Sequence, residues 1–407
     1  MKVRFALLLE KITTHFWLIP VAITISLIAF LYYLMQFEIV SRNLFIQELF
    51  FLEARPEAVR LLLSSIATSI MTVLGVVFSV IVLVIEQMSL QYTPRVVANF
   101  TRSKMAQVVL GVFVGTFAYC LILLMNIGQN NTAEDPIPRL AVAFAGILSI
   151  ACLLFLILFI HHITTSIQST QIIKDIYDET LSSLKNVIKD REHSHKESAI
   201  RTKAFPYCQI LKATKVGYVD AVNWKQLSEK LKIPNWEIHF HKVPGDYIQK
   251  DMELLSVWSD KPIKDETIER LEKIIEISSS RTISQDPGYG IQKLSDIALK
   301  ALSPGINDPS TAMEAIHSIT TIMLEYLREA PIRNRVHLDE NKVLIFIPMD
   351  THLLLKKGYD HILRFSEQHE VVKDLVRQDL RFIQGRIPEL ELKHYLEDKI
   401  SSIQLLH

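Results

Sequence analysis

One face of a long apolar stretch carries small polar side chains and ends in a carboxylate. The polar positions are three or four residues apart, with Val82 completing the spacing, so they share one side of an α-helix. They are Ser65, Thr68, Thr72, Gly75, Ser79 and Glu86. Within a membrane, hydroxyls bond to a helix backbone or to a neighbouring helix, and a carboxylate at the boundary needs water, a cation or an arginine.

Two interpretations of this polar stripe remain open. In the first, the small residues let neighbouring helices approach closely, so the stripe is a packing surface. In the second, copies of the helix surround an axis and the stripe lines a hydrated path. A ring of Glu86 carboxylates at the mouth of that path would attract cations.

Further polar residues fall at the expected membrane boundaries. After the stripe, Pro94 bends or ends the helix, and Arg95 is expected at the interface, paired with Glu86 or with lipid phosphate. His161 and His162 are adjacent, so on a helix they point to different sides and cannot chelate one metal ion together. We expect them to form interfacial or interhelical hydrogen bonds, with pH sensing as the less favoured alternative.

The run 301–312 combines helix-ending and helix-starting residues. The pair Pro304-Gly305 stops one helix, and Asp308 followed by Pro309 is typical of the start of the next. A junction between helices is therefore favoured over the alternative, in which the new helix N-terminus binds an anion. The residues concerned in either case are Asn307, Asp308, Ser310 and Thr311. A second polar turn, 281–288, could dock against this run.

No motif for catalysis is recognisable. The sequence has no nucleophile with a neighbouring base, no phosphate-binding loop and no paired-metal spacing, so we predict neither an enzyme nor a bound cofactor. The 44 basic and 44 acidic residues balance, which argues against a nucleic-acid partner. Three cysteines cannot form a disulfide framework, and this suits a reducing cytoplasm.

The elements that must position the stripe are membrane helices. Hydrophobic residues make up 49% of the chain and the mean hydropathy is +0.23, with the long apolar runs concentrated in residues 1–165. Four runs reach the roughly 20 residues needed to span a bilayer. They lie near 16–36, 61–85, 108–127 and 140–163. The first follows a charged start, as in a signal peptide, but it is too long and no cleavage pattern follows, so we expect it to remain as an anchor.

Charged loops predict the orientation of this membrane domain. Loop 86–107 is basic and loop 128–139 is mainly acidic, so the positive-inside rule puts the former, and with it both termini, in the cytoplasm. Loop 37–60 is then outside, although it contains three arginines.

The rest of the chain has the mixed texture of a soluble α+β domain. A helical stalk is expected over 166–204, a small β module over 205–260 and a helical α+β domain over 261–407, with a strand at 343–347. In the β module, two steps that begin at Gly217 and Gly245 form a quasi-repeat, which resembles the halves of a β-barrel-sandwich of the biotinyl or lipoyl type. No lysine occupies the hairpin tip that such carriers modify, so only the shape is predicted.

Five segments together resemble one bacterial family. They are Gly75–Ser79, Thr93–Arg95, Leu110–Phe117, Phe159–Ile163 and Ala301–Pro309. On these motifs the chain resembles the predicted-membrane-protein family called domain of unknown function 2254, over most of its length. The resemblance implies an inner-membrane protein of bacteria, and it supplies no catalytic residues.

Two function hypotheses follow. In the first, the protein is a homo-oligomeric, cation-conducting channel of the bacterial inner membrane. The second span lines its pore, the cytoplasmic domain assembles or gates it, and its partners are the lipid bilayer and inorganic ions. In the second, it is a non-conducting scaffold or sensor whose cytoplasmic domain binds a ligand or partner near 303–311. A secondary transporter is less favoured, because four spans show neither inverted repeats nor a broken helix pair.

Overall fold

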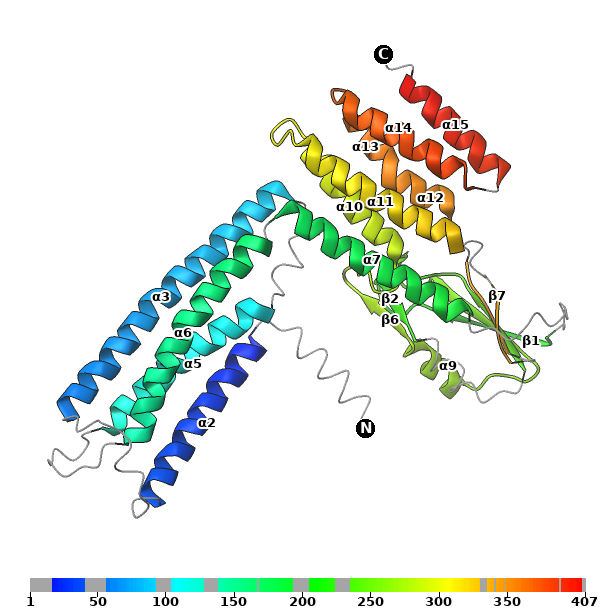
Figure 1. Ribbon diagram of the computed structural model, residues 1–407. Coiled ribbons are helices and arrows are strands. Elements are labelled where there is room, and N and C mark those ends of the chain that lie inside the picture. Colours follow the sequence, from blue (N-terminus) through cyan, green and yellow to red (C-terminus); the bar gives the residue numbers. More distant parts are fainter. Residues whose placement is uncertain are drawn as a thin grey trace. The chain divides into compact units, whose positions relative to one another are not determined.

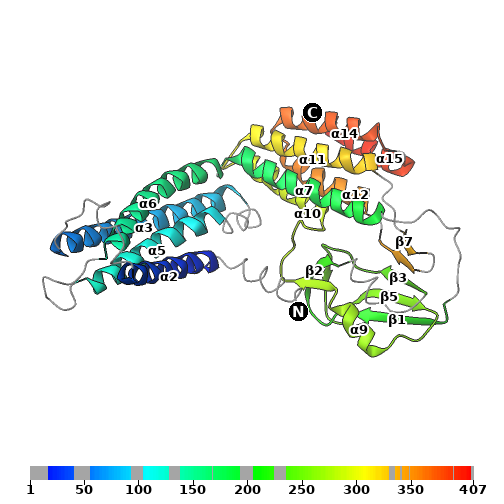
Figure 2. The same ribbon diagram turned by 60° about the horizontal axis from the view of Figure 1, so that its bottom comes forward.

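The computed structural model divides the chain into two compact units, Met1–Gln168 and Ser169–His407 (Figures 1 and 2). Each unit has its own buried hydrophobic core. The structure describes residues 17–40, 56–92, 104–127, 138–166, 168–192, 205–223, 235–329, 335–339, 342–347, 349–387 and 389–404.

Among the described residues of the first unit, four helices are long and apolar enough to cross a bilayer. They are α2 (Leu18–Val40), α3 (Pro56–Gln91), α5 (Lys104–Asn126) and α6 (Arg139–Ser166). Each overlaps one predicted span. Helix α3 is longer than its span because hydropathy marks only the apolar part of a helix. Its start is favoured by Pro56 at the first helical position and by Glu57 in the first turn.

Helix α5 packs against each of the other three membrane helices. It meets α2 through Gly111 and Gly115. A Cβ at Gly111 would lie 2.8 Å from Pro20 Cα, and one at Gly115 would be as crowded. This small-xxx-small spacing lets the two helix backbones approach closely. On another side of α5, the Tyr119 hydroxyl donates to the Ala141 carbonyl at 2.9 Å and ties α5 to α6.

The β part of the second unit consists of two sheets around a shared core. The larger sheet has the strand order β1-β5-β3-β8-β7, and the smaller has the order β4-β2-β6. The strands are β1 (Tyr207–Lys212), β2 (Gly217–Val222), β3 (Trp236–Phe240), β4 (Tyr247–Ile248), β5 (Glu253–Ser259), β6 (Ile275–Ser278), β7 (Arg335–Asp339) and β8 (Lys342–Ile345). All pairs are antiparallel except β3 with β8.

This architecture does not confirm the predicted barrel-sandwich shape. The described strands form two open sheets and no closed barrel. Strands β7 and β8 come from beyond the expected module and cover β3, which would otherwise be an unpaired edge. The two steps that suggested a repeat instead pair with each other, since Gly217 lies opposite Ile248 and Tyr218 opposite Tyr247 in the β2–β4 ladder.

The remaining elements of the second unit are helical. They are α7 (Ser169–Glu192), α9 (Asp265–Glu272), α10 (Pro287–Ala301), α11 (Pro309–Glu329), α12 (Thr351–Leu355), η3 (Lys356–Asp360), α13 (His361–Phe365), α14 (Glu370–Gln384) and α15 (Leu390–Gln404). Helix α12, η3 and α13 follow one another without a break, so they form one helix whose middle turn is a π-helix.

Helix α7 occupies the segment in which the sequence predicts a stalk, but it packs against α10 and α11 (Figure 1). One of its faces is buried, through Ile172, Ile173, Ile176, Thr180, Ser183 and Leu184. Gly290 of α10 makes room for this face, because a Cβ there would lie 1.8 Å from Thr180 Oγ1. The segment therefore contributes to the core of the second unit.

Candidate functional site

The polar stripe lies on the side of α3 opposite its buried side chains. All six stripe residues are exposed. The buried side chains of α3 are Val59, Leu63, Ala67, Ile70, Val77, Val84 and Met88. At 100° per residue, the two sets are on roughly opposite sides of the helix. The exposed apolar residues Val76 and Leu83 flank the stripe on one side and Phe78 flanks it on the other.

The hydroxyls of the stripe are bonded to their own helix. Thr72 Oγ1 donates to the Thr68 carbonyl and Ser79 Oγ donates to the Gly75 carbonyl, each at 2.9 Å. Such bonds satisfy the hydroxyl protons, while the oxygen lone pairs can still accept from water or from another helix. Gly75 has open space where a side chain would stand. Gly75 therefore differs from Gly111, where a side chain would clash with α2 inside the unit.

Glu86 follows the apolar part of α3. Residues 61–85 carry no charge and extend about 37 Å at 1.5 Å per residue, compared with a hydrocarbon core of about 30 Å. The exposed Glu86 carboxylate therefore lies at or beyond one boundary. Its predicted partner Arg95 lies outside the described residues.

The two histidines occupy the last part of α6, as predicted. His161 is exposed and His162 is half-buried. The backbone carbonyls of both accept from the Thr165 hydroxyl, at 3.1 and 3.0 Å. Across the described part of the chain, no group of three or more His, Cys, Asp or Glu side chains could hold a metal ion.

The run 301–312 forms a helix junction. Both oxygens of Asp308 are used at the start of α11, where the Thr311 amide donates at 3.1 Å and the Thr311 hydroxyl at 2.6 Å. Asn307 adopts the left-handed conformation, with φ of 50°, which asparagine tolerates better than most residues. These hydrogen bonds hold the pKa of Asp308 below its usual value. Since a carboxylate already fills the position that an anion would take, the anion-binding alternative for Ser310 and Thr311 loses its main support.

The second polar turn does not dock against this junction. The turn 281–288 and the run 301–312 lie at opposite ends of α10, which is continuous from Pro287 to Ala301. A helix of that length separates its ends by about 21 Å. The expected contact is therefore wrong, because the sequence between the two turns forms a rigid helix.

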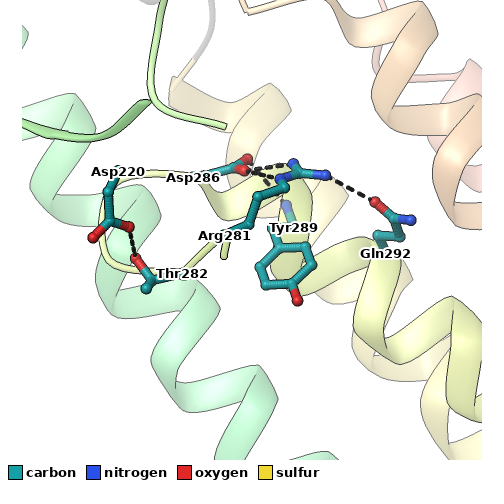
Figure 3. A network of polar contacts seen from close by, with 6 residues as sticks. All are labelled: Asp220, Arg281, Thr282, Asp286, Tyr289 and Gln292. Atoms are coloured by element: carbon teal, nitrogen blue, oxygen red, sulfur yellow. Dashed lines mark hydrogen bonds and ion pairs between the residues drawn. The ribbon is translucent and has the colours of Figure 1, made fainter. Parts of the chain in front are cut away.

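The second polar turn instead forms a buried network at the start of α10 (Figure 3). Arg281 donates from Nε and Nη2 to Asp286 Oδ2, at 3.0 and 2.5 Å, and from Nη1 to Gln292 Oε1 at 3.1 Å. Asp286 also caps α10, since its Oδ1 accepts from the Tyr289 amide at 3.1 Å. The Arg281 guanidinium lies 4.6 Å from the centre of the Tyr289 ring, within range for a cation–π interaction.

The network joins the β part to the helical part of the second unit. Thr282 donates to Asp220 Oδ1 of β2 at 2.6 Å. Gly245, at φ of 96°, lies against the Asp286 carboxylate so closely that a Cβ would be 2.2 Å from Oδ2. Burial raises the pKa of Asp286, and Arg281 opposes this shift. The arrangement buries a charge pair where the β part and the helical part of the second unit meet, so it can support that junction.

The family model described as "Predicted membrane protein (DUF2254)" matches residues 13–380. The chain belongs to this family. An uncharacterised protein of Mycobacterium bovis, and one from each of two strains of Mycobacterium tuberculosis, are each 28% identical to it over 282 residues. The match covers 66% of this chain and 53% of each relative, so the chain spans about half the length of these relatives. No solved structure matches it.

In this DUF2254 protein, two features were missed by sequence reasoning alone. The spacing of Gly111 and Gly115 is a local signal for close helix packing and could have been used. The Arg281–Asp286 network had a weaker signal, namely an Asp-Pro pair before a helical pattern, as in the junction at Asp308. Its remaining partners come from β2 and from the turn at Gly245, and no local pattern indicates them.

Proposed function

We propose that the protein is a homo-oligomeric membrane channel in which copies of α3 surround an axis. The observation that carries this proposal is the position of the stripe: its residues are exposed on the side of α3 opposite the packed face. Polar groups facing lipid are unfavourable, so this side is better suited to water or to a second copy than to lipid chains.

Two details support an axis rather than a flat contact. The stripe is narrow and is flanked on both sides by exposed apolar residues, as expected when a helix meets neighbouring copies and lipid on its flanks. Gly75 leaves open space in the middle of the stripe. A ring of Glu86 carboxylates at one end would attract cations, so the channel is proposed to conduct cations.

The soluble unit is proposed to be cytoplasmic and to assemble or gate the channel. The support is the basic loop 86–107, which the positive-inside rule places in the cytoplasm of a bacterial inner membrane. Since an even number of spans brings the chain back to the same side, the soluble unit would share that compartment.

A non-conducting scaffold or sensor is the second candidate. The hydroxyls of Thr72 and Ser79 donate to their own helix backbone, so they can be accommodated in a dry packing seam without water. In that case, the stripe holds copies together and the function lies in the soluble unit.

Ion flux in liposomes separates the two candidates. Full-length protein is compared with Thr72→Phe, after both are shown to elute as the same oligomer. Leu154→Phe, at an exposed position of α6, adds the same ring elsewhere and serves as the matched control. A channel predicts flux in the wild type and in the control, and none in Thr72→Phe.

A packing seam predicts a different pattern. Thr72→Phe would then lose assembly, and no protein would conduct, including a fragment that ends at Gln168 and so lacks a gate. That result would reject the channel and leave the scaffold.

A further inference from the structure

A cavity of about 370 Å³ lies between α10 and the helix that contains η3. Its volume is in the range of small-molecule sites. The polar side chains of its wall are Gln292, Ser295, Asp296, Lys356, Lys357 and His361. They come from segments about 60 residues apart, which the fold brings together.

Ser295 is the first sign that this wall is built for a ligand. The side chain is 2% exposed, and its Oγ forms no hydrogen bond with the described part of the chain. In helices, a serine or threonine hydroxyl commonly donates to the carbonyl four residues earlier, as Thr320 and Ser318 of α11 do. A buried hydroxyl without a partner is costly. Its Oγ has almost no accessible surface, so a ligand in the cavity would meet the hydroxyl only after the side chain turns towards the cavity, where it would gain the partner that it lacks.

Positive charge is the second sign. Lys357 is half-buried and forms no ion pair with a described carboxylate within 4.0 Å. Burial and the neighbouring Arg281 lower the pKa of Lys357, whereas the carboxylates of Asp286, Asp246 and Asp350 act in the opposite direction. Asp286 already pairs with Arg281, and none of these three carboxylates belongs to the cavity wall. Lys356 adds a second ammonium group, and Asp296 is the one carboxylate of the wall.

Hydrogen-bond donors also exceed acceptors in the wall. The Gln292 carbonyl oxygen accepts from Arg281, so its amide nitrogen points away from Arg281 (Figure 3). The wall then offers the Gln292 amide, two ammonium groups and an imidazole, together with the Ser295 hydroxyl once its side chain turns. A phosphoryl group has several acceptor oxygens and is commonly bound by lysine. A carboxylate is bound best by the arginine fork, and here that fork is used by Asp286.

The π-helical turn helps to form this wall. Gly358 lets the turn press against the core, since a Cβ there would lie 3.0 Å from Ile319 Cγ2 and 3.4 Å from Ile291 Cγ2. The turn thereby brings Lys356 and Lys357 next to α10. Single π-helical turns occur frequently at functional sites.

We propose that this cavity binds a small phosphorylated molecule, with Ser295, Gln292 and the two lysines donating to the phosphoryl oxygens. The cavity is larger than a phosphate group, and Leu299 and Leu353 provide apolar wall for the rest of the ligand. The site does not depend on whether the membrane unit conducts ions.

Isothermal titration calorimetry tests the proposal on the full-length protein in detergent without added phospholipid. The probes are inorganic phosphate and glucose 6-phosphate, with glucose and citrate for comparison. We expect both phosphate probes to bind, and glucose 6-phosphate to bind more tightly. Lys357→Gln and Ser295→Ala should each weaken binding about tenfold. Lys356→Gln, at an exposed position, should weaken it without disturbing folding.

Lys300→Gln is the matched control, because Lys300 is on α10 but outside the cavity wall. It should bind the probes as the wild type does. The proposal is overturned if neither phosphate probe binds up to about 10 mM, or if the cavity variants bind as the control does. Tighter binding of citrate than of either phosphate probe would also overturn it, since the site would then select carboxylates.

Discussion

The guanidinium of Arg281 bonds to Asp286 and Gln292, and the two members of the ion pair are only 16% and 10% exposed. Removing one partner of a buried pair leaves the other charge without compensation, which costs about 3–5 kcal/mol. We therefore expect Arg281→Ala to lower the free energy of unfolding by about 3 kcal/mol. Urea unfolding followed by tryptophan fluorescence measures this, because Trp236 is fully buried in the same unit.

A surface pair provides the control for Arg281. Arg328 pairs with Glu325 on α11 but is 68% exposed. Solvent-exposed pairs contribute little, so Arg328→Ala should change stability by less than about 1 kcal/mol. An equal loss of unfolding free energy in Arg281→Ala and Arg328→Ala would show that the buried network stabilises the fold no more than a surface pair does.

The lowered pKa of Asp308 predicts that the stability of the fold depends on pH. Hydrogen bonds from the Thr311 side chain and backbone lower its pKa in the folded protein, so the folded state takes up this proton less readily than the unfolded state. The stabilisation is present above the usual value near pH 4 and is lost as the pH falls through the folded pKa. Asp308→Asn should keep the helix cap but reduce this loss, whereas Asp308→Ala should cost about 1 kcal/mol at neutral pH. Thermal melts of the three proteins between about pH 3 and pH 7 measure both effects.

The prediction for Glu86 applies only if the proposed channel conducts ions. Its carboxylates would favour cations at the mouth, so Glu86→Gln should shift the reversal potential in a salt gradient towards that of a less selective pore. Glu57→Gln, at the other end of α3, controls for the loss of a charge from the same helix. An unchanged reversal potential in Glu86→Gln would remove Glu86 from the path.

At the scale of elements, the glycines of the membrane unit fall into two classes. Gly111 and Gly115 make backbone-level contact with α2, whereas Gly75 has open space. We expect Gly111→Leu to disrupt the α2–α5 contact and lower the yield of folded protein in detergent. Gly75→Leu should leave the fold of the single chain intact and alter self-association. Size-exclusion chromatography with light scattering measures folded yield and oligomer mass together. A folding defect in Gly75→Leu would place an unrecognised contact on the stripe.

How well the sequence predicts an element depends on the distance over which its pattern acts. The four spans follow from the local hydropathy of each segment, and all four are found as helices. The parallel pairing of β3 with β8 joins Trp236 to Lys342, and no local pattern encodes a partner about a hundred residues away. The similarity of the sequences at Gly217 and Gly245 likewise does not indicate that the two steps pair with each other in one ladder.

The same difference between local and long-range patterns applies to the candidate sites. The stripe could be found from the sequence because all its members are on one helix. The cavity could not, since Ser295 and Lys357 are brought together by the packing of α10 against η3. A buried serine without a partner is visible only once burial is known.

At the scale of the whole molecule, α7 determines where the second unit begins. Its buried face covers α10 and α11, so a fragment from Ser169 should fold. A fragment from residue 205, the end of the predicted stalk, should not, because it would expose the apolar surface that Ile172, Ile173 and Ile176 cover. Circular dichroism and thermal melting distinguish the two. Cooperative unfolding of the shorter fragment would mean that α7 is dispensable.

The π-helical turn at 356–360 also marks a place where the α12–η3–α13 helix can change its length. A π-helical turn accommodates one residue more than an α-helical turn. If one residue were deleted there, the turn could close as a regular α-helical turn, and the residues after it would keep their faces. Ile362, fully buried now, would stay in the core. A deletion elsewhere in the same helix would rotate everything after it by about 100°. Among relatives, a one-residue gap at this place would therefore indicate the same internal face of the helix without the wider turn.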